Sequence, residues 1–142
     1  MENNFKAVIK MCASKFLFLD KQKLDEYLPE LFEILYTNMN SIVPTGNAYD
    51  EDFSLWKPGI ISEMQKNERK IVLMYVDGML AGYFRYCVYS DTASLVMEDI
   101  QIKALYRGKY NIFRTLYGFV LEHINDDIHF VEAYANKINK KS

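Results

Sequence analysis

Apolar residues in the first third of the chain recur at helical spacing behind Asp20. A short polar side chain in front of such a stripe is typical of a helix N-cap. Pro29 lies within the stripe, so either the helix kinks there or a second helix begins with Pro29 in its first turn. The stripe consists of Leu24, Tyr27, Leu28, Leu31 and Leu35.

A loop and a second helical segment follow. Residues 41–50 carry proline, glycine and asparagine in close succession, which is typical of a loop. Residues 53–66 return to helical spacing, and Pro58-Gly59 predicts an interruption of that helix. Its apolar positions, which we expect to face the core, are Trp56, Ile60, Ile61 and Met64.

From residue 70 onward the hydrophobic pattern becomes that of β-strands. Residues 71–76 are nearly all apolar, and Asp77-Gly78 behind them is a strong signal of a two-residue hairpin turn. Because several strand positions are apolar on both faces, we expect a layer on each side of the sheet. The other strands are expected at 5–11, as an edge strand, at 79–89 and at 93–103, with a turn at Ser90-Asp91.

The last helix is the clearest element of the sequence. Asn111 is expected to cap its N-terminus, and residues 125–127 (Asn-Asp-Asp) are expected to end it. Residues 128–135 then have the composition of a strand. A strand, a helix and a further strand predict a βαβ unit with parallel strands. The apolar face of the helix is formed by Ile112, Phe113, Leu116, Tyr117, Val120, Leu121 and Ile124.

The strand at 93–103 changes phase in its middle. Apolar residues occupy odd positions before Glu98 and even positions after Asp99. A strand that keeps its core contacts through such a slip needs one extra residue, which is a β-bulge. The alternative is a strand buried on both faces without a bulge. The residues concerned are Leu95 and Met97 before the slip, and Ile100 and Ile102 after it.

Composition narrows the class of protein. With 142 residues and half of them hydrophobic, the chain has the length of one domain and enough apolar surface to fold. A net charge of −2 argues against a nucleic-acid-binding protein. Cys12 and Cys87 are expected to be reduced thiols, and neither His123 nor His129 has a metal-like partner, so no metal is expected.

The sequence also gives an expectation for the cellular compartment of the protein. No apolar run approaches the ~18–20 residues needed to cross a bilayer, so no membrane partner is expected. The first residues lack the basic region of a secretory signal, and Lys15 interrupts the segment behind them. We therefore expect a cytoplasmic protein.

Basic residues gather where the last helix begins. Arg107, Lys109 and Arg114 add positive charge there, and Gly108 allows a tight turn. Helix N-termini present unpaired N–H groups and a partial positive charge, which favour phosphate. The alternative is a solvated loop without a ligand.

This combination resembles the Gcn5-related N-acetyltransferase (GNAT) family. The bulged strand, the Tyr-Arg-Gly-Lys loop at 106–109, the amphipathic helix and a strand ending at Asn136 carry the resemblance. The family's loop signature is Gln/Arg-x-x-Gly-x-Gly/Ala, whose backbone amides hold the pyrophosphate of acetyl-CoA. Arg107 matches its first position, but Tyr110 and Ile112 replace the two small residues, and bulk there can hinder the approach of a phosphate.

The resemblance implies a mixed α/β fold with a GNAT-like central sheet, and it implies a site. Glu98 would be the general base, directly or through water, with Asp99 as the second candidate. The plain alternative for Glu98 is a solvated or ion-paired carboxylate. Tyr83, Tyr86 and Tyr89 are expected either to line the acceptor site or only to pack against other side chains of the fold. The implied residues that bind acetyl-CoA are Ile100, Gln101, Ile102, Arg107, Gly108, Lys109, Tyr110, Asn111, Ile112 and Asn136.

The resemblance favours an enzyme that moves an acetyl group from acetyl-CoA to a primary amine of a small molecule or protein. Residues 1–142 would form one GNAT-like acyltransferase domain. The family normally continues with a helix and two strands, so we expect a domain that is incomplete at its C-terminus or completed by another chain, and an open sheet edge favours self-association. One alternative is a non-catalytic GNAT-like module that binds a protein. Another is a small-molecule sensor of unrelated α/β fold, whose pocket is bordered by residues 44–47 and the tyrosine-rich hairpin.

Overall fold

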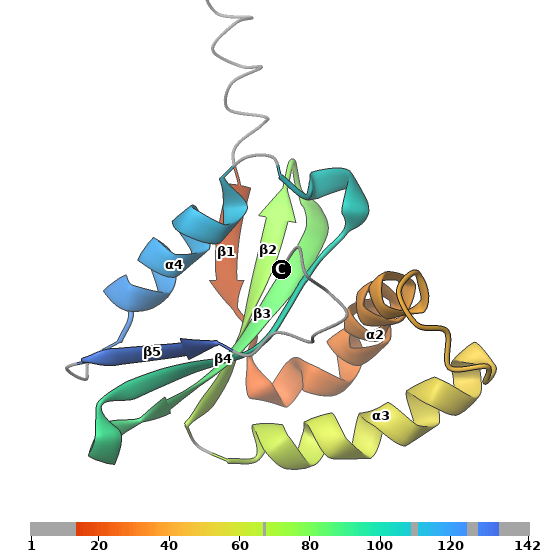
Figure 1. The fold of residues 1–142 in the computed structure, drawn as a ribbon, viewed down its shortest axis with the longest axis horizontal. Helices are drawn as coiled ribbons and strands as arrows, with labels where there is room; N and C mark the ends of the chain where they lie inside the picture. Colours follow the sequence, from red (N-terminus) through yellow and green to blue (C-terminus); the bar gives the residue numbers. More distant parts are fainter. Residues whose placement is uncertain (1–13, 67, 109–110, 125–127, 134–142) are drawn as a thin grey trace, which may run out of the picture.

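The chain forms one mixed sheet with helices on both faces (Figure 1). The computed structural model describes residues 14–66, 68–108, 111–124 and 128–133. The strands follow one another across the sheet in chain order, and all neighbours are antiparallel except the last pair, which is parallel. The strands are β1 (Ser14–Phe18), β2 (Arg69–Val76), β3 (Met79–Tyr89), β4 (Ser94–Ile102) and β5 (Phe130–Ala133).

Two helices cover one face of this sheet and a third covers the other. The helices α2 (Leu24–Asn40) and α3 (Tyr49–Met64) pack on the face that carries Ile71, Leu73 and Tyr83. The helix α4 (Ile112–Glu122) packs on the opposite face (Figure 1). The predicted mixed α/β class with a layer on each side is confirmed. Single turns of 3₁₀ helix, η1 (Lys21–Lys23), η2 (Ser90–Thr92) and η3 (Ala104–Tyr106), complete the elements.

The first helix begins as the sequence predicts. The Asp20 side chain accepts a hydrogen bond from the Gln22 backbone N–H at 3.0 Å, which caps η1 directly before α2. Helix α2 then runs through Pro29 as one element, so the alternative of a second helix beginning at Pro29 is wrong.

The predicted interruption of the second helix is also wrong. Helix α3 begins at Tyr49, earlier than predicted, and continues through Pro58. Proline removes one backbone hydrogen bond from a helix interior. Aromatic packing compensates for this loss, because Phe32 of α2 lies 5.3 Å from Phe53 and 5.1 Å from Trp56 between ring centroids. Ile60 and Met64 are buried in the same cluster, as predicted.

The hairpin and the bulge are both confirmed. Asp77 and Gly78 have φ values of 51° and 79°, the left-handed pair that a two-residue hairpin turn requires. In the β3–β4 ladder Arg85 pairs with Asp99 and the next residue pairs with Met97, so Glu98 is the extra residue. The alternative of an unbulged strand is therefore wrong.

The βαβ unit is confirmed, but its helix buries a narrower stripe than predicted. Strand β5 runs parallel to β4. Ile112, Leu116 and Val120 are buried against the sheet, whereas Phe113 and Leu121 are 51% and 45% exposed. The predicted strand at 5–11 and the end of the predicted strand at 128–135 lie outside the described residues. Helix α4 ends at Glu122, earlier than the predicted end at 125–127.

Candidate active site

The bulge of β4 lies next to its parallel pairing with β5. The last β4–β5 pair in the described residues is Met97 with Ala133, and the bulge residue Glu98 follows Met97 directly. Beyond the bulge, the Lys103 N–H donates to the Ala81 carbonyl at 2.8 Å. Residues of an antiparallel strand alternate between facing the partner and facing away from it. The backbone groups of Ile100 and Ile102 are therefore directed away from β3.

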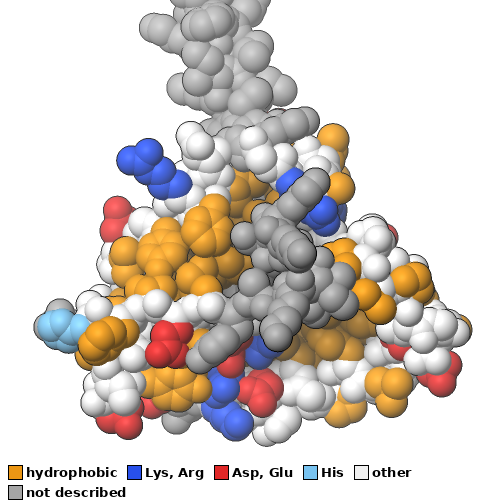
Figure 2. Space-filling model, in the orientation of Figure 1, with side chains coloured by type: hydrophobic (Ala, Val, Ile, Leu, Met, Phe, Trp, Pro, Cys, Tyr) orange, Lys and Arg blue, Asp and Glu red, His pale blue; other side chains and the backbone are white. Residues whose placement is uncertain are grey.

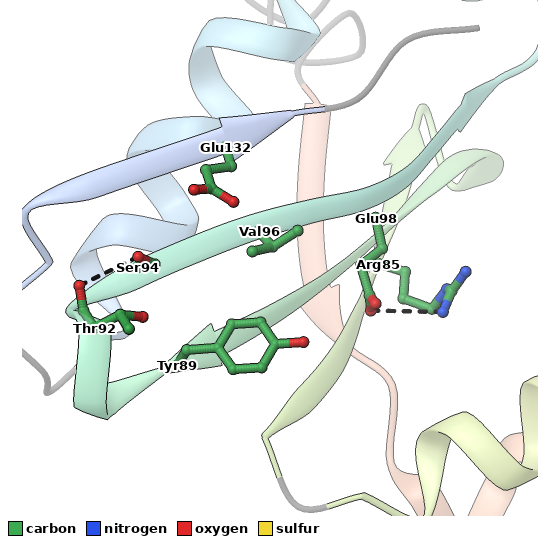
Figure 3. Close-up of a pocket in the computed structure, with 7 residues that line it drawn as sticks. All are labelled: Arg85, Tyr89, Thr92, Ser94, Val96, Glu98 and Glu132. Carbon is green, nitrogen blue, oxygen red and sulfur yellow. Dashed lines mark hydrogen bonds and ion pairs between the residues drawn. The ribbon is translucent and has the colours of Figure 1, made fainter.

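An open pocket of about 570 Å³ lies beside this point (Figure 3). Its side chains come from the end of β3, from η2, from β4 and from β5, and most of them are polar. Among the lining residues, Glu98 is the bulge residue itself. The pocket is lined by Arg85, Tyr89, Thr92, Ser94, Val96, Glu98 and Glu132.

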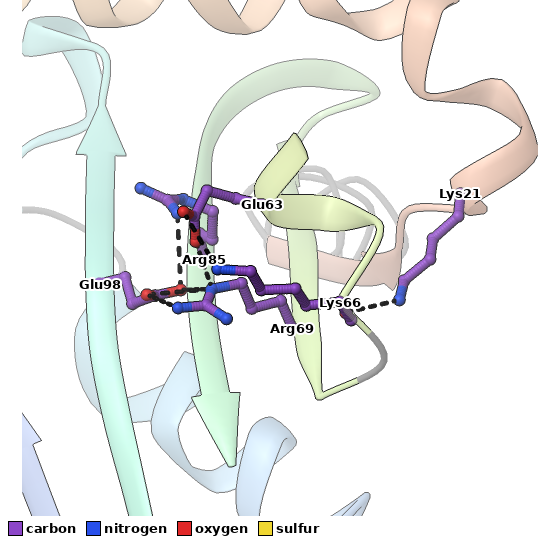
Figure 4. Close-up of polar contacts among 6 residues, drawn as sticks. All are labelled: Lys21, Glu63, Lys66, Arg69, Arg85 and Glu98. Carbon is purple, nitrogen blue, oxygen red and sulfur yellow. Dashed lines mark hydrogen bonds and ion pairs between the residues drawn. The ribbon is translucent and has the colours of Figure 1, made fainter. Parts of the chain in front are cut away.

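Two arginines hold the Glu98 carboxylate (Figure 4). The Arg69 Nε donates to Oε1 at 3.1 Å and to Oε2 at 3.2 Å, and its Nη2 lies 3.1 Å from Oε2. The Arg85 Nη1 lies 3.5 Å from Oε1. Arg69 also pairs with Glu63 of α3, at 2.8 Å from Oε2. Glu98 is thus an ion-paired carboxylate at the edge of the pocket, and its role as general base stays a prediction.

The contact with Glu98 changes the pKa of the Arg69 guanidinium. Burial by itself lowers the pKa of Arg69, but the hydrogen bond and the negative charge of Glu98 oppose burial and raise the pKa above its ordinary value. Arg69 therefore stays positively charged beside Glu98.

Asp99 takes a different position from Glu98. Its Oδ2 accepts from the Tyr83 hydroxyl and its Oδ1 from the Gln101 amide, both at 2.8 Å. Tyr83 is buried, and burial followed by the negative charge of Asp99 raises the pKa of this phenol well above its ordinary value. Tyr83 thus remains a neutral donor to Asp99.

The loop before α4 has the features of an anion site in part. Gly108 has a φ of 70° and Asn111 one of 48°, both left-handed. Asn111 stands at the predicted N-cap position, but its side chain makes no capping hydrogen bond. Ile112 is 4% exposed and packs in the core, so its bulk is directed into the sheet. Lys109, Tyr110 and Asn136 lie outside the described residues.

Arg107 is already hydrogen-bonded within the protein. Its Nε donates to the Ile102 carbonyl at 3.0 Å and its Nη2 donates to the Asn38 side-chain oxygen. Asn38, a buried residue of α2, also donates to the Ile102 carbonyl at 3.1 Å. The structure thus brings Glu98 to the pocket and Ile100, Gln101, Ile102 and Arg107 to one end of β4.

The three tyrosines differ in position. Tyr89 lines the pocket, whereas Tyr83 is buried under α2 and α3, and Tyr86 is buried on the α4 face. Burial raises the pKa of Tyr86 to about 12.

In the described part of the chain, no group of three His, Cys, Asp or Glu could hold a metal ion. No helix among those same residues has the length and apolar character needed to cross a membrane.

Three residues of the site were missed in the sequence. Arg69 and Arg85 lie in otherwise apolar strands, and Asn38 lies on the apolar face of α2. A charged or amide side chain on a core face usually has a buried partner, and this was the available signal. The partners of these three residues could not be predicted from the sequence, since they lie on other elements of the fold.

Comparison with known proteins supports the fold. No protein-family model and no curated protein matches the sequence. A possible acetyltransferase from Clostridium difficile 630 aligns with a TM-score of 0.63 and 13% identity, over 90% of this chain and 83% of that one. The aminoglycoside acetyltransferase meta-AAC0020 from an uncultured soil metagenomic sample, in complex with sisomicin, aligns with a TM-score of 0.58 and 10% identity, over 89% and 80%.

A third structure is relevant to the cofactor. AAC(6')-Iy in complex with the bisubstrate analogue CoA-S-monomethyl-acetylneamine aligns with a TM-score of 0.57 and 13% identity, over 89% of this chain and 82% of that one. The chain has the GNAT fold, with the sheet order, the bulge and the parallel β4–β5 pair described above. The alternative of a sensor domain with an unrelated fold is therefore wrong.

Proposed function

We propose that this GNAT-fold chain is an N-acetyltransferase, which moves an acetyl group from acetyl-CoA to a primary amine. The observation that carries the proposal is the bulge at Glu98 in β4, beyond which the backbone groups of Ile100 and Ile102 are directed away from β3. Residues 1–142 are proposed to act as one acyltransferase domain.

The cofactor would bind as an added strand. An extended ligand can pair with the exposed backbone of a strand, and Ile100 and the N–H of Ile102 offer such groups. The pyrophosphate would then lie against the loop from Arg107 to Asn111 and the α4 N-terminus, where N–H groups favour an anion. The burial of Ile112 supports this placement, because the bulky side chain points away from the loop surface. The complex of AAC(6')-Iy with a CoA analogue supports acetyl-CoA as the donor.

The acceptor would occupy the open pocket of about 570 Å³ beside Glu98. The hydroxyls of Tyr89, Thr92 and Ser94 line it together with the carboxylates of Glu98 and Glu132. Carboxylates and hydroxyls suit an ammonium group with further polar substituents. The complex of meta-AAC0020, a protein of the same fold, with sisomicin supports an acceptor of this general kind.

The proposed reaction is a direct transfer. The amine nitrogen bonds to the thioester carbonyl carbon, and the carbonyl electrons move to oxygen. A backbone N–H at the bulge stabilises that oxyanion. The C–S bond then breaks, the amine proton leaves to a base, and the CoA thiolate takes up a proton from solvent. The products are an N-acetylated amine and free CoA.

Glu98 or a water beside it is the proposed base. Both carboxylate oxygens already accept hydrogen bonds from Arg69. This arrangement favours an ordered water on Glu98 as the group that contacts the amine. Asp99 is the weaker candidate, because Glu98 lines the pocket and Asp99 does not.

The test is an assay of amine-dependent CoA release. The purified chain is supplied with acetyl-CoA and, in turn, an aminoglycoside, a polyamine and a short peptide with a free N-terminus. The proposal predicts thiol release with at least one acceptor. It also predicts a product about 42 Da heavier than the acceptor, because one acetyl group replaces one hydrogen. Thiol release at the rate of the amine-free control for all acceptors contradicts it.

A second candidate function is supported by an exposed apolar surface. Phe113 and Leu121 of α4 and Phe130 and Val131 of β5 are between 43% and 62% exposed. Figure 2 shows apolar side chains gathered over α4. Such a surface suits a non-catalytic module that binds another protein. This candidate predicts that the chain binds neither acetyl-CoA nor free CoA.

A further inference from the structure

Four side chains form a continuous line of hydrogen bonds along the end of β4. Arg107 donates to the Asn38 side-chain oxygen, and Asn38 Nδ2 donates to Gln101 Oε1 at 3.0 Å. Gln101 Nε2 donates to Asp99 Oδ1 at 2.8 Å. The line therefore connects the bulge with the loop before α4, through a residue of α2.

All hydrogen bonds in this line point in one direction. A cation stands at the donor end, Arg107, and a carboxylate stands at the acceptor end, Asp99. The two amides between them are oriented so that each accepts from the Arg107 side and donates to the Asp99 side. Hydrogen bonds that follow one another in the same direction polarise and strengthen one another. Amides do not pass protons, so the line fixes positions and is not a proton path.

The same residues occupy the Ile102 carbonyl. Arg107 Nε and Asn38 Nδ2 both donate to this oxygen, at 3.0 and 3.1 Å. Because the backbone groups of Ile102 are directed away from β3, these two donors close the end of the strand edge. A ligand that pairs with β4 would then use Ile100 and the Ile102 N–H, and would turn into the loop at Arg107.

Asn38 is the centre of this arrangement. It is 8% exposed, and it touches three partners on two other segments. Its own carbonyl accepts from the Ser41 hydroxyl at 2.7 Å, where the loop after α2 begins. A buried amide with every donor and acceptor engaged holds its neighbours in one geometry.

We infer that Asn38 is a positioning residue, which holds the Arg107 side chain at the end of β4 in the geometry that binds acetyl-CoA. The inference rests on the proposed function for its ligand. In this role the two hydrogen bonds of Arg107, to Asn38 and to the Ile102 carbonyl, hold its positive charge beside the end of β4, where the cofactor would pass.

The experiment compares Asn38→Leu with Thr37→Ala, an exposed neighbour on the same helix that makes none of these contacts. The dissociation constant for acetyl-CoA, the kcat at saturating acetyl-CoA and the melting temperature are measured for both. The inference predicts that Asn38→Leu weakens acetyl-CoA binding about 10-fold, as expected for one or two lost positioning hydrogen bonds, while kcat stays within about twofold. Asn38→Asp, which keeps the oxygen that accepts from Arg107, restores part of the affinity.

A second readout does not need the ligand. The Arg107 Nε–H signal in a ¹⁵N NMR spectrum reports its hydrogen bond to Ile102, and the inference predicts faster solvent exchange of this proton in Asn38→Leu. If Asn38→Leu does not fold, Arg107→Met removes the same anchor from an exposed position, with the same predicted loss of affinity.

The possible results distinguish a failure of this inference from a failure of the proposed function. Unchanged affinity in Asn38→Leu or Arg107→Met overturns the inference, and so does an equal fall in kcat and affinity with a large loss of melting temperature. If the wild type binds no acetyl-CoA, the proposed function fails, and the Arg107 exchange rate alone then decides: unchanged exchange overturns the positioning role, and faster exchange supports it for Arg107.

Discussion

Arg69 donates to both carboxylate oxygens of Glu98, at 3.1 and 3.2 Å, although β2 and β4 are not neighbours in the sheet. The two side chains meet over β3 beside the bulge, where Arg85 of β3 contacts the same carboxylate at 3.5 Å. The contact ties three strands together at the place where β4 leaves its regular register.

Replacement of Arg69 should therefore destabilise the fold strongly. The Arg69 and Glu98 side chains are only 13% and 17% exposed. Breaking such a pair leaves a charge without its partner, and we expect Arg69→Met to lower the free energy of unfolding by about 2–4 kcal/mol. Urea unfolding measures this. As a control, Lys66→Met breaks the exposed pair with Glu63 and should cost no more than about 0.5 kcal/mol. Equal effects of the two substitutions would show that Glu98 is not held as described.

Tyr86 should make stability fall at alkaline pH. Burial raises its pKa in the folded chain to about 12, against an ordinary value of 10.0. The folded state therefore favours the neutral phenol, so this contribution is complete below pH 10 and is lost as the pH rises through 12. Two pKa units correspond to roughly 2–3 kcal/mol. Unfolding of wild type and Tyr86→Phe between pH 8 and pH 12 measures it, and the difference between the two proteins should grow across that interval in favour of Tyr86→Phe.

Two glycines should respond in opposite ways to alanine. A Cβ on Gly82 would collide with the Gln101 carbonyl oxygen and stand 3.0 Å from the Ile102 Cα and from the Met74 side chain. Backbone cannot move aside cheaply, and we expect Gly82→Ala to cost about 3 kcal/mol or more. A Cβ on Gly118 in α4 meets nothing within 4 Å, and Gly118→Ala should stabilise by about 0.5–1 kcal/mol. Thermal unfolding measures both, and a neutral Gly82→Ala would contradict the close approach of β3 and β4.

Glu98→Gln separates the proposed chemistry from cofactor binding. The substitution keeps the shape of the side chain but removes its charge, so it should lower turnover about 10-fold or more. The affinity for acetyl-CoA should stay within about twofold. Glu63→Gln changes the same ion network outside the pocket and should leave turnover nearly intact. Full turnover in Glu98→Gln would remove Glu98 from the mechanism.

The sequence predicted those features that depend on local pattern. The turn at Asp77-Gly78 follows from residue type alone, because both positions need positive φ. The bulge at Glu98 follows from the change of apolar phase along one strand. Strand β1 was missed because Leu17 is apolar yet 44% exposed, so its five residues do not show a clean alternation. Helix α3 was cut short in the prediction because its stability at Pro58 comes from packing against Phe32 of another helix.

The sequence indicated which residues belong to the site, but not which side chains contact one another there. Glu98 and Arg107 could be named from their places beside a bulge and a helix N-terminus. Their partners could not, since Arg69, Arg85 and Asn38 come from three different elements that meet only in the folded chain. The direction of the Ile112 side chain into the core also depends on how α4 packs, and the sequence pattern showed only its bulk.

The central claim is that acetyl-CoA binds along the β4 edge at Ile100, and calorimetric titration tests it most directly. We expect the wild type to bind with a dissociation constant in the micromolar range, about −8 kcal/mol. Ile100→Pro removes the outward N–H and should weaken binding about 10-fold or more, whereas Ile100→Ala keeps that N–H and should change affinity little. No heat and no thermal stabilisation of the wild type at roughly millimolar acetyl-CoA, about −4 kcal/mol, would contradict the account.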